Sequence, residues 1–183
     1  KDSAEGEATF TGPDGAEFRV VLRKLAPQTT DLQTFGGVAI NQPVHGATGF
    51  GIDKLYTEYA NLLIQGFADV YRNGELIVKD NYMWLGASRR AQAISNDDKK
   101  AGLYKPEKPL ADMIVHLVLL PHQLLPDGTY AHEPVPTGVI GLDGKEQGFL
   151  HINYRNNITM EGSRFFDKLP SASVSTSTKS HGH

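Results

Sequence analysis

Large apolar residues recur at every second position in several short stretches of this chain. In residues 16–25, the apolar side chains of Phe18, Val20 and Leu22 alternate with mainly charged neighbours. A period of two is typical of a β-strand that buries one face and exposes the other to water. Residues 9–11 precede this stretch across a Gly-Pro-Asp-Gly turn, so we predict a hairpin near the start of the chain.

The clearest strand pair is predicted for residues 62–85, LLIQGFADVYRNGELIVKDNYMWL. Two apolar-rich runs flank Asn73-Gly74, and these two residue types tolerate the positive φ angles that a type I′ hairpin turn requires. A two-residue loop pairs Arg72 with Glu75 and then each next residue outward in an unbroken register. The heavy apolar residues 82–85 predict that the far end of this hairpin lies in the core.

Further apolar stretches extend the pattern along the chain. The spacing of Ile52, Leu55, Tyr56 and Tyr59 is that of one helical face, which favours a helical turn over residues 53–60 before a strand from about residue 62. A helix that continues to Gln65 is the alternative. Residues 110–120 are the most hydrophobic stretch and predict a central strand that ends at Pro121. Two later strands, residues 138–142 and 148–154, are predicted on either side of an Asp-Gly turn.

These strands and turns predict a mainly β fold. Short strands separated by Asp-Gly or Asn-Gly turns are typical of an antiparallel sandwich or an open barrel. We favour a single β-sandwich domain of immunoglobulin-like or jelly-roll type over residues 9–169, with long loops and at most one or two short helices. Residues 1–8 are predicted to be a flexible lead, and residues 170–183 a low-complexity Ser/Thr tail.

The composition agrees with one folded domain and excludes several classes of protein. The chain has 183 residues, of which 39% are hydrophobic, and a net charge of −3. This length suffices for one domain with its own core. A pI near 6.2 gives no basic surface for nucleic acid. The apolar runs are too short for a transmembrane helix, and the absence of cysteine excludes disulfides, thiolate metal sites and a cysteine nucleophile within these residues.

The first residues favour an extracytoplasmic location. The chain begins with Lys1 and a polar lead, as expected of a mature periplasmic or secreted protein after removal of a signal peptide. A lipidated cysteine directly before Lys1 would add peripheral association with a membrane. The Asn-Ile-Thr sequence at residues 157–159 matches the acceptor pattern for an N-linked glycan.

Residues 86–109 change character, because they are rich in charge and end in two prolines. We predict a charged surface loop there, with a short helix near residues 88–94. This loop is either a solvated insertion or a segment that docks a protein partner through Arg89 and Arg90. The low-complexity tail is a second candidate for contact with an assembly partner.

Candidate metal chemistry rests on histidines, since imidazole is a common ligand of zinc and copper. His122 and His132 flank the predicted turn at residues 127–128, so we expect them to face each other across a hairpin. Glu133 would add a third ligand. The alternatives are solvated loop histidines at these two positions and a His116 that is hydrogen-bonded in the core. The candidate ligands of a Cu or Zn ion are His122, His132, His116 and His45.

Catalytic motifs are few. The chain lacks the Gly-x-Ser-x-Gly sequence of a nucleophile elbow, and its carboxylates show no recognisable pairing. His45 begins a glycine-rich loop in which small residues would leave room for a ligand, so a hydrolase site in this loop stays an alternative. Strand parity places His151 on the face opposite Leu150 and Ile152, and therefore in solvent.

The sequence therefore favours a non-enzymatic, extracytoplasmic accessory or binding subunit that docks onto a larger assembly through its charged loop and its tail. One alternative is a periplasmic or secreted Cu- or Zn-binding protein that uses loop histidines. The other is a hydrolase with its site at the loop around His45. No cofactor is implied beyond such a metal ion.

Overall fold

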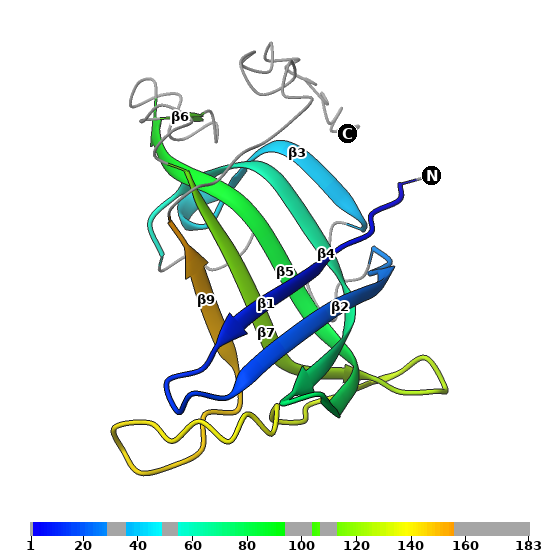
Figure 1. Cartoon of the computed structure of the whole chain (residues 1–183). Coiled ribbons are helices and arrows are strands. Elements are labelled where there is room, and N and C mark those ends of the chain that lie inside the picture. The colour runs from blue at the N-terminus through cyan, green and yellow to red at the C-terminus, as the bar shows by residue number, and fades with distance from the viewer. Residues whose placement is uncertain (1, 29–35, 49–54, 94–103, 107–112, 156–183) are drawn as a thin grey trace, which may run out of the picture.

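The computed structural model describes residues 2–28, 36–48, 55–93, 104–106 and 113–155, which form one antiparallel sheet of nine strands (Figure 1). Within these residues there is no α-helix, and the only helical segment is a 3-10 turn at Gly46–Thr48. The prediction of a mainly β, antiparallel fold is confirmed. The strands are β1 (Glu7–Thr11), β2 (Glu17–Leu25), β3 (Val38–Val44), β4 (Glu58–Arg72), β5 (Glu75–Ala93), β6 (Tyr104–Pro106), β7 (Ile114–Leu124), β8 (Tyr130–Ala131) and β9 (Leu150–Tyr154).

The strands lie side by side in the order β1-β2-β4-β5-β7-β8. The long strand β4 carries β3 beside its first half and β2 beside its second half. Strand β7 likewise pairs with β9 and then with β8, and β6 pairs with the end of β5. The described strands therefore belong to one curved sheet, and the predicted division into the two sheets of an immunoglobulin-like or jelly-roll sandwich is not confirmed.

The sheet is rolled, so that its two far edges approach each other (Figure 1). Tyr154 at the end of β9 donates a hydrogen bond from Oη to the backbone oxygen of Thr9 in β1, at 3.2 Å. Strands β1 and β9 form no ladder with each other in the described part of the chain. The roll is therefore open between them.

The central hairpin of β4 and β5 has the predicted turn. Arg72 lies opposite Glu75, and Asn73 and Gly74 have φ angles of 49° and 86°. The first hairpin is also as predicted, with β1 and β2 paired in register across their Gly-Pro-Asp-Gly turn. Local turn chemistry therefore determines both hairpins.

Irregular pairing near Asp69 bends the central hairpin. An unbroken register would place Val70 opposite Ile77, but Val70 lies opposite Val78. The predicted register is therefore wrong beyond Tyr71. Asp80 has a positive φ of 53°. The carboxylate of Asp69 accepts hydrogen bonds from the backbone N–H of Asp80 at 3.3 Å and from Arg23 Nε at 2.7 Å. Because β-bulges bend and twist the strands that contain them, these irregularities help to roll the sheet.

Several predicted boundaries are wrong. Strand β5 continues to Ala93, so residues 86–93 are neither the start of a surface loop nor a short helix. Strand β4 begins at Glu58, where the spacing predicts a helical turn, and strand β1 begins at Glu7, within the predicted flexible lead. In each case pairing with a neighbouring strand overrides the preference that local composition suggests.

Strand β7 also continues past its predicted end at Pro121. The proline lies where the pairing with β5 shifts, since Asn81 pairs with Gln123 but Met83 pairs with Leu119. Three residues of β7 thus lie opposite one residue of β5, and Pro121 is the middle one. A proline, which has no N–H to donate, is tolerated at such an irregularity of the ladder.

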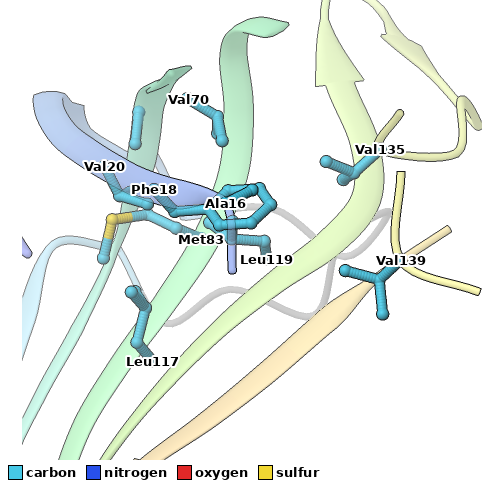
Figure 2. Packing of buried hydrophobic residues seen from close by; sticks show 10 residues of the cluster. Ala16, Phe18, Val20, Val70, Met83, Leu117, Leu119, Val135 and Val139 are labelled. Atoms are coloured by element: carbon cyan, nitrogen blue, oxygen red, sulfur yellow. The ribbon is translucent and has the colours of Figure 1, made fainter. Parts of the chain in front are cut away.

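The main core lies on the inner face of the roll (Figure 2). It combines alternate residues of β2, β4, β5 and β7, among them Phe18, Val70 and Leu119, which are at most 1% exposed. The segment between β8 and β9 adds Val135 and Val139 to this core. Burial of these side chains stabilises the rolled form, because each removes a large apolar area from water.

Some predicted features lie in a segment that forms no regular strand, and others lie outside the described residues. The strand predicted over 138–142 reduces to a single bridge between Ile140 and Glu146. The tail, the glycosylation pattern and most of the remaining charged loop fall on residues 94–103, 107–112 and 156–183, outside the described part. Among the described residues, no helix is long and apolar enough to cross a membrane.

Candidate functional site

A cavity of about 390 Å³ lies on the inner face of the roll. Strand alternation explains its apolar wall. Met83 and Leu85 of β5 pair with Leu119 and Leu117 of β7, so that their side chains share one face of the sheet. The apolar residues that line the cavity include Val20, Leu22, Ile64, Leu85, Val115 and Leu117.

The polar part of the cavity lies at the gap between β1 and β9. Glu5, Glu7 and Thr9 line it from one side, and Tyr154 lines it from the other. The backbone oxygen of Gly6 accepts a hydrogen bond from β2, so the residues next to it turn their backbone groups away from β2 and toward the gap. Burial raises the pKa of Tyr154, and its hydroxyl therefore stays protonated as a donor. The described lining residues include no lysine, arginine or histidine.

A second candidate site lies on the outer face of the sheet and is centred on His116, whose two neighbours in sequence line the cavity. His116 is 9% exposed. Its Nδ1 lies 3.1 Å from Nε2 of His151, and its Nε2 lies 3.5 Å from a carboxylate oxygen of Glu58. The same oxygen accepts a hydrogen bond from Ser88 Oγ at 2.5 Å. The four side chains come from β4, β5, β7 and β9, which are successive in the sheet.

His45 belongs to the surroundings of this site. It has a positive φ of 65°, is 7% exposed, and its ring stands edge-on to Trp84 with the centroids 5.3 Å apart. Burial lowers the pKa of both His45 and His116. The negative charge of Glu58 raises both pKa values, but by a smaller amount than burial lowers them. Both imidazoles therefore favour the neutral form, which is the form that binds metal ions.

We expect acidification from about pH 7.5 to about pH 5.5 to lower the free energy of unfolding of the metal-free protein. The pKa of His45 is lower in the folded chain than the ordinary value of 6.5. The unfolded chain therefore binds more protons in this window, and stability falls as pH falls. One fully titrating histidine changes the stability by at most about 1.4 kcal/mol per pH unit.

Urea denaturation in the presence of a chelator measures this slope. His45→Asn is the matched variant, because asparagine also tolerates a positive φ. This variant should show a shallower dependence on pH. A slope equal to that of the unchanged chain would show that His45 does not carry the effect.

The predicted pair of histidines near the 127–128 turn does come together. The ring centroids of His122 and His132 are 5.1 Å apart, with an angle of 71° between the planes. However, the described residues contain no group of three or more His, Asp or Glu side chains placed to hold one metal ion. The four predicted ligands therefore do not form one metal centre, and His116 lies against His151 instead. Metal binding by the pair at 122 and 132 stays a prediction.

The predicted exposed position of Arg89 is wrong. Arg89 lies in β5 opposite Tyr59 and is only 9% exposed. Burial raises the pKa of Tyr59, while the charge of Arg89 acts in the opposite direction. Arg90 lies in the same strand, and its contact with a partner stays a prediction.

Sequence reasoning missed the contact between His116 and His151. Parity along the later strand correctly indicates that His151 is exposed. The two histidines become neighbours because β9 pairs with β7, with Asn153 opposite His116 and His151 opposite Val118. Parity identifies the face of each strand, but it does not identify the strand that lies beside it.

The geometry gives no specific support to a hydrolase near the glycine-rich loop. Ser88 is 3% exposed and donates its hydrogen bond to the carboxylate of Glu58, so no imidazole is placed as its base in this contact. An activated serine nucleophile requires such a base. The hydrolase therefore stays an untested alternative.

Comparisons with protein-family models, with curated protein sequences and with solved structures found no match to this chain. A function is therefore inferred from the geometry of its sites.

Proposed function

We propose that the protein is a non-enzymatic binding protein that holds a small apolar molecule in the cavity of its rolled sheet. The observation that carries this proposal is the cavity of about 390 Å³ with its wall of apolar side chains. Ligand pockets typically have volumes of about 300–1,000 Å³ and mainly apolar walls. A cavity of about 150 Å³ holds one benzene molecule, so by scaling this one suits a ligand of roughly 15 non-hydrogen atoms.

The polar groups at the gap favour an uncharged ligand. Tyr154 donates its hydroxyl proton to the backbone oxygen of Thr9, so its oxygen is left to accept from a ligand, and the backbone groups of Glu7 in β1 and of Glu5 just before it face the gap. A carboxylate ligand would find no lysine, arginine or histidine among the described lining residues to pair with its charge. Because an unpaired charge in an apolar site is costly, we expect a neutral alcohol or ring compound to bind better than a fatty acid.

The accessory role and the extracytoplasmic location belong to the same proposal as expectations. A binding protein of this kind acts outside the cytoplasm by carrying its ligand or presenting it to an assembly. The charged residues that follow β5 in the sequence support the docking role.

Fluorescence titration with N-phenyl-1-naphthylamine, a neutral apolar fluorophore, tests the cavity. We expect saturable binding to the unchanged chain. Leu85→Trp fills the cavity from β5 and should weaken binding by at least about tenfold, a loss of about 1.4 kcal/mol. Leu76→Trp is the matched control, because Leu76 lies in the same strand but is 49% exposed. This variant should bind as the unchanged chain does.

Two results would overturn the proposal. One is the absence of saturable binding to the unchanged chain, and the other is equal binding by the two tryptophan variants. Thermal unfolding of each variant shows whether it is folded. If Leu85→Trp is unfolded, Val115→Phe replaces it, because this substitution fills a smaller part of the cavity. Displacement of the fluorophore by decanol but not by decanoate would support a neutral ligand.

A further inference from the structure

We propose that His116 and His151 together bind a divalent transition-metal ion, Cu²⁺ or Zn²⁺, on the outer face of the sheet. This site is separate from the cavity, because the residues on both sides of His116 in the sequence line the cavity and its own side chain points to the opposite face. The inference therefore does not depend on the proposed binding of an apolar ligand.

The two ring nitrogens have the separation that a shared metal ion requires. A zinc–imidazole bond is about 2.0–2.1 Å long. Two such bonds place their nitrogens about 2.9 Å apart at a right angle and about 3.3 Å apart at the tetrahedral angle. The observed separation of Nδ1 of His116 and Nε2 of His151, 3.1 Å, lies between these values.

Glu58 favours the tautomer of His116 that carries its proton on Nε2 and can bind a metal ion through Nδ1. Its carboxylate lies 3.5 Å from Nε2 of His116, which is the nitrogen that faces away from His151. That nitrogen is buried, so a proton on it is stabilised by the carboxylate rather than by water. The lone pair of Nδ1 then points toward His151. A histidine ligand whose second nitrogen faces a carboxylate is a recurring arrangement in metal sites.

Ser88 in turn holds the carboxylate. Its hydroxyl donates to the oxygen of Glu58 that faces His116, at 2.5 Å. The chain of contacts runs across four successive strands, which keep the two histidines in place without movement of a loop. His151 is exposed, so an ion can reach the pair from solvent. Two protein ligands leave the remaining coordination positions to water, which agrees with the absence of a three-residue metal group among the described residues.

Copper titration of the full chain tests this site. His181→Ala and His183→Ala are present in every sample, because terminal histidines also bind copper. We expect one Cu²⁺ per chain by isothermal titration calorimetry, and an electron paramagnetic resonance spectrum with coupling to imidazole nitrogens. His116→Ala and His151→Ala should each remove this binding. Glu58→Gln should weaken it by about 10- to 100-fold, as substitution of a carboxylate behind a histidine ligand usually does.

His122→Ala distinguishes this site from the competing pair at His122 and His132. Binding that survives His122→Ala and is lost in His151→Ala supports the inference. Binding that is lost in His122→Ala and kept in His151→Ala overturns the inference. The absence of bound Cu²⁺ and Zn²⁺ also overturns it, and would mean that His116 and His151 share only a proton. Because His151 is exposed, its substitution should not unfold the protein, so the test does not depend on the buried His116.

Discussion

Replacing Phe67 by alanine is expected to destabilise the protein by about 3–5 kcal/mol, the usual cost of removing a fully buried aromatic ring from a core. Phe67 in β4 is 0% exposed. Its ring packs against Tyr82 and Tyr130, with centroids 5.9 and 6.0 Å away. Since small domains have total stabilities of about 5–15 kcal/mol, this single change removes a large share of the total.

Urea denaturation followed by circular dichroism measures the loss. Phe149→Ala is the matched control, because it removes the same ring from a residue that is 50% exposed. The control should change the stability by no more than about 0.5 kcal/mol. Equal losses in the two variants would contradict the packing that places Phe67 at the centre of its cluster.

The local elements of the fold were accessible from sequence because their causes are local. Asn73-Gly74 specifies the central turn through the φ angles that these residues tolerate. The alternation from Phe18 to Val20 specifies which face of β2 is buried. Both features depend on residues within a few positions of each other.

The rolled form of the sheet was not accessible in the same way. It depends on bulges near Asp69, and the side chain of Asp69 is held by Arg23, which lies 46 residues away in the chain. Asp80 tolerates a positive φ, but its sequence neighbours do not show that it lies opposite a bulge of another strand. Because bulges bend the strands that contain them, this pairing helps to produce one rolled sheet with the cavity inside it.

The candidate sites show the same difference between local and long-range causes. The sequence predicts that His122 and His132 meet, because they lie at similar distances on either side of one short turn. His116 and His151 meet through the pairing of β7 with β9, which a single sequence does not specify. The cavity has the same origin, since its wall combines residues from strands that are far apart in the chain.

Replacing Gly66 by alanine is expected to destabilise the protein by about 1–3 kcal/mol, the usual cost of overpacking a core. Gly66 is buried in β4 beside the irregular pairing of β2. A Cβ atom there would lie 2.5 Å from Cδ1 of Leu22 and 2.7 Å from the backbone oxygen of Lys24. The leucine side chain can rotate away, but the carbonyl group of Lys24 is part of the strand. The change therefore moves backbone at the point where the sheet bends.

Gly86→Ala separates this steric effect from the general effect of adding a methyl group to a strand glycine. Gly86 is also buried, in the neighbouring strand β5, but its nearest contact would be Cδ1 of Leu63 at 3.3 Å, the flexible end of a side chain. Since alanine also reduces the conformational freedom of the unfolded chain, we expect Gly86→Ala to be neutral or to stabilise by up to about 1 kcal/mol. Denaturant midpoints of the two variants should therefore move in opposite directions or differ clearly in size. Equal midpoints would mean that the strand of Lys24 yields without cost, and that the bend in β4 does not depend on the close approach of the two backbones.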